Sequence, residues 1–197
     1  MKKVFLFLIA LMLGIVAFAQ EKNLFDDGHL SFKGVSLSGS LDDFVAKLVS
    51  DGYTLKGSQI AGALLKGRFA SESDCTIGVL TTQRTHIVYC VAVSFEKKTS
   101  WISLKNQYQE YKSMLSTKYG EPSKHLERFY SPYYEGDGYE LQGLKLGKCT
   151  YTSIFEVSNG SVILTMNDDG SLILYYSDKE GSLLNDREER MNALNDL

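Results

Sequence analysis

Two stretches of helical periodicity, each followed by a series of short strand-like segments, constrain the fold of this chain more than any other feature of its sequence. In the first stretch, residues 41–51, apolar side chains recur at three- and four-residue spacing, which predicts an amphipathic helix. Ser40 is a suitable N-cap, Asp43 follows three residues later, and Gly52 is placed to end the helix in a left-handed conformation. Strand-like segments follow at 53–56, 61–69, 75–80 and 87–95.

The second stretch repeats this plan with a longer helix. Helical spacing over residues 101–119 is carried by Trp101, Leu104, Tyr108, Tyr111 and Leu115, and Gly120-Glu121-Pro122 is placed to end the helix. We expect strands at 124–130, 139–146, 149–157, 161–166 and 171–176. Because the connections are short, the strands should pair antiparallel. The sequence therefore predicts an α+β fold, a tandem repeat of one helix followed by an antiparallel β-meander.

This organisation divides the chain into five parts. Residues 1–19 are expected to be a signal peptide, and residues 20–39 an N-terminal loop or edge segment. Residues 40–98 and 99–177 would form the first and second helix-plus-sheet units. Residues 178–197 are polar with few apolar anchors, which is typical of a loosely attached helix or a disordered tail.

The first residues predict export. Lys2 and Lys3 form a positive region, residues 4–18 an apolar one, and Ala17-Phe18-Ala19 a small-x-small cleavage site. The apolar run is shorter than the roughly 20 residues that a spanning helix needs, so no integral membrane span is expected after signal cleavage. Gln20 stands where a lipoprotein would have a cysteine. We expect a periplasmic or secreted protein.

Three cysteines, Cys75, Cys90 and Cys149, would then lie in an oxidising compartment. If Cys75 lies on the more apolar face of its strand, Cys75 and Cys90 point to opposite sides of the sheet and cannot form a disulfide. A four-residue loop that pairs Leu80 with Thr85 would instead place the two cysteines opposite each other. The hydrophobic pattern favours the first register, with free and mostly buried thiols.

Charge and motifs argue against several classes of function. The chain has a net charge of −3 at pH 7, and loss of Lys2 and Lys3 makes it more acidic, so nucleic-acid binding is not expected. The three histidines lack the spacing of a zinc site, and no nucleophile elbow occurs. We therefore expect no metal, no cofactor and no enzymatic activity.

One segment, residues 129–140, departs from what folding alone requires. It contains four tyrosines with a proline and glycines: Tyr130, Tyr133, Tyr134 and Tyr139. Tyrosine offers a large contact area and a hydroxyl at low entropic cost, which makes these four the candidate binding residues. The alternative is a hairpin whose tyrosines pack inward at the sheet edge. A second candidate surface is the polar sheet face that includes Lys66 and Arg68, although such residues are often only solvated.

Three short stretches carry a resemblance: Ala17-Phe18-Ala19-Gln20 at the cleavage site, Gly39-Ser40-Leu41-Asp42-Asp43-Phe44 at the first helix, and Lys118-Tyr119-Gly120-Glu121-Pro122 after the second. With these, the chain resembles uncharacterised small secreted proteins of Gram-negative gut bacteria, a resemblance that implies no activity. Its architecture is also similar to that of beta-lactamase inhibitor proteins, whose tandem helix-sheet repeats form a concave sheet face that grips a partner. That likeness transfers no residue, so it implies only the general mode of binding.

These observations favour an exported, non-catalytic binding module that uses an exposed sheet face and the tyrosine-rich loop. Its partner is unknown; an envelope or extracellular protein fits best. The alternative is a small-ligand binding protein of the cell envelope, for a glycan or a lipid, which would need an apolar cavity or an aromatic groove.

Overall fold

A computed structural model describes residues 28–195 as helices and a mainly antiparallel sheet. The expected signal peptide and the first part of the N-terminal segment lie outside the described residues. In chain order the elements are β1 (Ser31–Phe32), β2 (Val35–Ser36), α2 (Leu41–Ser50), β3 (Thr54–Gln59), β4 (Gly62–Phe69), β5 (Glu72–Thr81), β6 (Val88–Ser94), α3 (Trp101–Tyr119), β7 (Lys124–Phe129), α4 (Glu140–Lys145), β8 (Cys149–Val157), β9 (Gly160–Met166), β10 (Leu172–Asp178) and α5 (Lys179–Asn195).

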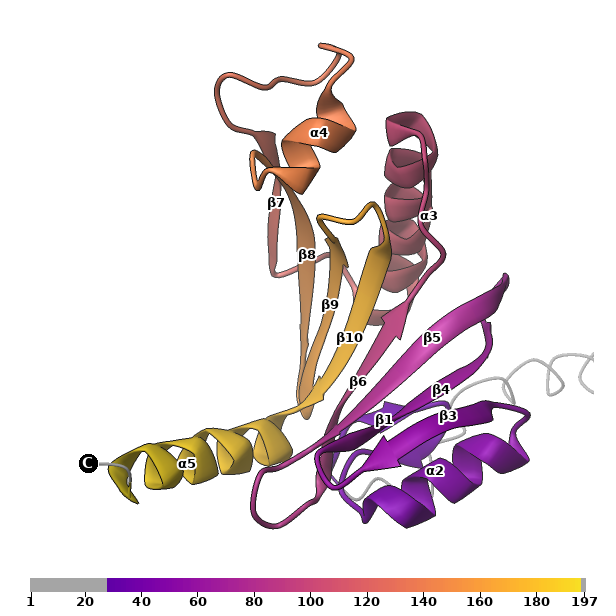
Figure 1. Cartoon of the computed structure of the whole chain (residues 1–197), viewed down its shortest axis with the longest axis vertical. Helices are drawn as coiled ribbons and strands as arrows, with labels where there is room; N and C mark the ends of the chain where they lie inside the picture. The colour runs from indigo at the N-terminus through magenta and orange to yellow at the C-terminus, as the bar shows by residue number, and fades with distance from the viewer. Residues whose placement is uncertain (1–27, 196–197) are drawn as a thin grey trace, which may run out of the picture.

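The larger sheet contains eight strands in the order β3-β4-β5-β6-β10-β9-β8-β7, and each neighbouring pair is antiparallel. Strands β6 and β10, distant in sequence, pair at its centre, with Val93 opposite Leu174. This pairing joins the strands that follow α2 to the strands that follow α3 in one continuous, strongly twisted sheet (Figure 1). The predicted α+β class is confirmed.

Helices α2 and α3 begin at the residues that the sequence indicated. The Ser40 hydroxyl accepts the backbone N–H of Asp43 at the start of α2, and the Ser100 hydroxyl accepts that of Ser103 at the start of α3. Such caps satisfy N–H groups that have no partner within the first helical turn. Each helix then buries one apolar face against the sheet: Phe44, Val45 and Leu48 from α2, and Trp101, Leu104, Gln107, Tyr108, Tyr111 and Leu115 from α3.

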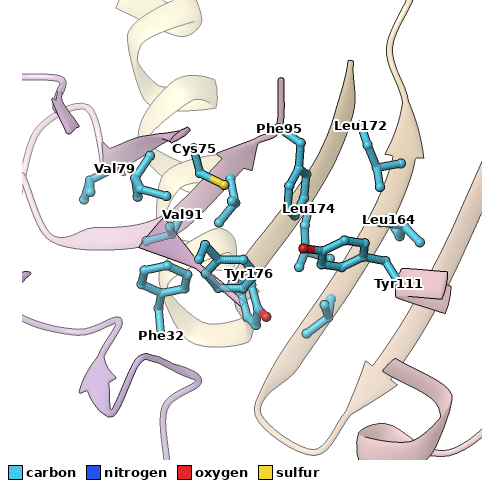
Figure 2. Packing of buried hydrophobic residues seen from close by; sticks show 14 of the residues in the cluster. Phe32, Cys75, Val79, Val91, Phe95, Tyr111, Leu164, Leu172, Leu174 and Tyr176 are labelled. Carbon is cyan, nitrogen blue, oxygen red and sulfur yellow. The ribbon is translucent and has the colours of Figure 1, made fainter. Parts of the chain in front are cut away.

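A single core lies between these helices and one face of the sheet. Figure 2 shows Phe32 of the β1–β2 hairpin, Val91 of β6, Leu174 of β10 and Tyr111 of α3 in one cluster. Aromatic contacts extend through it: the rings of Phe32 and Tyr176 are 5.3 Å apart between centroids, and those of Phe95 and Tyr111 are 4.5 Å apart. The core therefore joins both halves of the sheet.

Two expectations about local structure have definite outcomes. The predicted strand at 139–146 is wrong, because Glu140–Lys145 forms the short helix α4. Leu141 and Leu144, three residues apart, share one side of a helix, whereas in a strand they would point to opposite faces. Gly143 also lets the turn pack against the ring of Tyr133. The prediction of free, buried cysteines is confirmed for all three. Cys75 belongs to the core cluster, whereas Cys90 lies opposite Ser177 on the other face of the sheet.

Candidate functional site

The candidate site is the sheet face that lies opposite α2 and α3, which we name the open face. Alternation along the strands fixes its members, because residues such as Leu65, Val91 and Leu164 are buried in the core and their chain neighbours point the other way. Strand register then aligns the open-face side chains in two neighbouring rows. The middle row contains Leu64, Gly78, Ala92, Tyr175, Ile163, Ile154 and Lys124. The upper row contains Lys66, Thr76, Ser94, Ile173, Thr165, Thr152 and Leu126.

All positions of both rows are at least partly exposed. Leu64 is 46% exposed and Leu126 is 38% exposed, large fractions for leucines within strands. The centre of the face, on β6, β10 and β9, carries aliphatic side chains, a tyrosine and hydroxyls, and Thr165 is hydrogen-bonded to Thr152 across the strands at 2.8 Å. The open face is therefore a neutral, partly apolar surface that spans seven adjacent strands.

Charged side chains of the two rows lie at the ends of the face. Lys66 lies on β4, 3.4 Å from Asp74, and Lys124 lies on the edge strand β7. Arg128, also on β7, continues this basic edge beyond the upper row, opposite Thr150. By contrast, Glu127 points to the core side, where it forms an ion pair with Lys112 of α3. The edge strand thus places its cations on the open face and its anion under the helix.

The four candidate tyrosines do not form one cluster in the same environment. Tyr130 follows β7 and lies beside Arg128, whose guanidinium carbon is 4.6 Å from the ring centroid. Hydrogen bonds from Arg128 and then Thr150 lower the pKa of the Tyr130 hydroxyl. Tyr130 therefore extends the open face at its β7 edge. Tyr133 is partly covered and packs against Gly143 of the helix α4, where the inward-packing alternative expected a hairpin at the sheet edge.

Tyr134 and Tyr139, at 64% and 62% exposed, remain available to solvent. The loop that carries them is held by acidic side chains: the Asp137 carboxylate accepts the backbone N–H groups of Tyr134 and Tyr139 at 3.1 and 2.7 Å. Glu135 pairs with Lys105 of α3 and accepts the Tyr151 hydroxyl. The acidic residues of the segment thus anchor the loop on α3 and β8.

Sequence patterns missed most of the open face. Only Lys66 of its two rows was singled out, along with Arg68, while Tyr175, Ile163 and Ile154 were not recognised as surface residues. Their strands are apolar at successive positions on both faces, as a fully buried strand would be, so alternation could not reveal the exposed side. One signal could have revealed the exposed side: these strands are apolar on both faces, but no helix follows β8 or β9 to cover the second face.

Other features of the described residues offer less chemistry. A polar groove of about 620 Å³ lies between the start of α2 and the β5–β6 turn, with Ser40, Gln59, Thr85 and His86 among its lining residues. His86 has a left-handed backbone, with φ of 56°. No three histidine, cysteine, aspartate or glutamate side chains of residues 28–195 gather into a group that could hold a metal ion. In the same range, no helix has the length and apolar character needed to cross a membrane.

Comparison with protein-family models, with curated proteins and with solved structures finds no match to this chain. The site must therefore be judged from its own geometry.

Proposed function

We propose that this chain is an exported, non-catalytic binding module, and that a protein partner docks on the open face. One observation carries the proposal: partly exposed aliphatic, aromatic and hydroxyl side chains continue without a charge across the central strands β6, β10 and β9. Interface centres are depleted in charged residues and enriched in aromatic ones, with a polar rim. The middle row, with Tyr175 at its centre and Lys124 at its end, follows this pattern.

The size of the face supports a macromolecule rather than a small ligand. At a strand spacing of about 4.8 Å, seven strands give a width of about 30 Å. A standard protein interface buries about 800 Å² on each partner, which corresponds to a patch of similar width. The twist of the sheet (Figure 1) would let a rounded partner contact several strands at once.

Tandem duplication would account for this continuous face. Helix α2 is followed by four strands, β3 to β6, and α3 by four strands, β7 to β10, with α4 inserted between β7 and β8. In our proposal these are two copies of one unit whose last strands pair. We propose that this arrangement corresponds to the tandem repeats of beta-lactamase inhibitor proteins, whose concave sheet face grips a partner.

The predicted tyrosine site enters the proposal in two parts. Tyr130 would contact the partner together with Arg128 at the edge of the open face. Tyr134 and Tyr139 would form a separate contact on the loop, while Tyr133 holds the loop against α4. We place the protein in the periplasm or outside the cell, on the evidence of its first residues.

Capture experiments with residues 20–197 test the proposal in envelope and culture fractions. Ile163→Lys introduces a charge in the centre of the open face at a half-exposed position. Ser113→Lys makes a comparable change on the exposed side of α3 and is the matched control. We expect a cross-linked protein that the wild type and Ser113→Lys retain and that Ile163→Lys loses by at least tenfold.

A partner that Ile163→Lys captures as well as the wild type would show that the open face is not the binding surface. The double variant Tyr134→Ala, Tyr139→Ala then separates the loop from the sheet, since both side chains are exposed and their removal should leave the fold intact. If the wild type captures no protein, the module function fails. The polar groove beside His86 then becomes the place to screen for small ligands.

A further inference from the structure

The last helix, α5, packs against the lower end of the open face beside the β5–β6 turn. It begins directly after β10 and contacts β6, β9 and β10. The Ser182 hydroxyl is 3.0 Å from that of Ser177, an open-face residue of β10, and Gly181 packs against Tyr89. In Figure 1, α5 leaves the lower end of β10 and points away from the sheet. The strands above it carry the exposed rows of the open face.

The row of the open face nearest this helix contains Cys90, Ser177 and Ser161. Cys90 of β6 lies opposite Ser177, which lies opposite Ser161 of β9. Cys90 is only 7% exposed, whereas Ser177, Ser161 and the residues of the middle row are at least partly exposed, although its side chain points to the same face. Since α5 is the element packed on this face near β6, we attribute the burial of Cys90 to α5.

The contact between α5 and the sheet is unusually polar. Its buried residues are Gly181, Asn185 and Glu188, none of them a large apolar side chain. Meanwhile Leu183, Met191 and Leu194 are 49%, 51% and 69% exposed. Helices normally bury their apolar side and expose their polar side, as α2 and α3 do here. Helix α5 exposes these apolar side chains along with most of its charged ones, and Leu184 is only partly covered, so little apolar burial holds it in place.

Two buried carboxylates hydrogen-bond the start and the middle of α5 to the rest of the fold, and Gln83 of the turn adds exposed contacts with Glu189 and Asn192. Asp178, fully buried at the end of β10, accepts the backbone N–H groups of Leu30 and Gly181, both at 2.8 Å. Glu188, 4% exposed, accepts the backbone N–H of Arg84 at 2.6 Å and the hydroxyl of Thr85 at 2.7 Å. Asp178 fixes the start of α5, whereas Glu188 fixes its middle on the β5–β6 turn.

We propose that α5 is a detachable cover that controls access to the lower end of the open face. When the helix leaves, hydrogen bonds to water can replace those of Glu188. Because α5 buries little apolar side chain, its release also exposes little apolar surface of the helix. It would uncover Cys90 and so complete a row of the open face in which Ser177 and Ser161 are already partly exposed. The role of α5 in regulating partner binding rests on the proposed function. Its detachment from the sheet does not depend on that function.

The buried thiols provide a built-in assay for detachment in the full-length mature chain. Cys90 lies under α5, whereas Cys75 and Cys149 lie in the core and serve as internal references. We would measure iodoacetamide labelling of each cysteine by mass spectrometry at pH 8, without denaturant. Local release of α5 predicts that Cys90 of the wild type reacts at least tenfold faster than Cys75 and Cys149.

Glu188→Gln should raise the labelling rate of Cys90 by about fivefold, because an amide offers an N–H where the turn already donates hydrogen bonds. Asp186→Asn is the matched control on an exposed position of the same helix and should not change the rate. Thr85→Val, which removes one donor to Glu188, is a second variant and should act in the same direction as Glu188→Gln.

Equal labelling of all three cysteines in the wild type, or a parallel increase of all three in Glu188→Gln and Thr85→Val, would overturn the proposal. The first result means that α5 opens only with the whole fold, and the second means general destabilisation. Because labelling requires no partner, it separates a failure of the cover from a failure of the binding function. Partner capture that is unaffected by Ile163→Lys would refute only the proposed binding function of the open face.

Discussion

At the scale of single residues, one tight steric constraint lies where β9 meets β10. A Cβ atom on Gly160 would lie 2.2 Å from the carbonyl oxygen of Ser177, a backbone atom that cannot move without disturbing the strand pairing. We expect Gly160→Ala to lower the free energy of unfolding by about 1–3 kcal/mol, the usual range for overpacking. Gly57→Ala is the control, because no atom lies within 4 Å of its added Cβ. Urea unfolding of both variants would measure the difference, and equal losses would contradict the steric explanation.

Residue-scale features were predictable where the cause is local. Ser40 could be recognised as an N-cap because the cap and its partner Asp43 are three residues apart in sequence. The environments of the tyrosines could not be predicted, since they depend on groups that are distant in the sequence. Tyr133 packs on a helix ten residues later, and Glu135 is held by Lys105 of α3. Composition identified the tyrosine-rich segment but not which rings would be exposed.

At the scale of elements, the capping interactions make a quantitative prediction. Ser40→Ala leaves the Asp43 N–H at the start of α2 without its acceptor and should destabilise the protein by about 1 kcal/mol. Ser40→Asn retains an acceptor and should restore most of that loss. Ser113→Ala, on the exposed side of α3, provides the control for removing a serine hydroxyl within a helix. Thermal and urea unfolding would test the order of the three variants, and a loss for Ser40→Asn as large as for Ser40→Ala would exclude the cap.

Helices were predicted best where the hydrophobic period and the capping residues agreed. Helix α3, Trp101–Tyr119, follows the expected range because five apolar residues share one face over many turns. Residues 139–146 are too short for periodicity to separate a helix from a strand, and α4 forms there instead. Helix α5 shows the opposite difficulty, since it packs through Gly181, Asn185 and Glu188. No hydrophobic pattern marks such a contact in advance.

At the scale of the whole molecule, sequence patterns indicate which face of a strand is buried but not which strands lie side by side. Alternation predicted the polar face that carries Lys66 and Arg68, yet the pairing of β6 with β10 joins residues about eighty positions apart. That pairing creates the continuous open face, so the candidate site could not be assembled from the sequence alone. The expectation of an exposed sheet face was general, and the rows that compose it follow only from the register.

Acid should loosen contacts that join distant parts of this fold. Burial tends to raise the pKa of Glu127, but hydrogen bonds from Lys112 and Gln109 of α3 outweigh it, and the net pKa is below the ordinary 4.5. A carboxyl whose folded pKa is depressed stabilises the fold above its unfolded pKa, and this contribution disappears as the pH falls through the folded value. We therefore expect the free energy of unfolding to decrease as the pH falls below 4.5. The decrease should be smaller in Glu127→Gln than in Glu110→Gln, a variant at an exposed position of α3. Urea titrations between pH 7 and pH 3 would measure it, and identical pH profiles for the two variants would show that the Glu127–Lys112 contact contributes nothing to acid sensitivity.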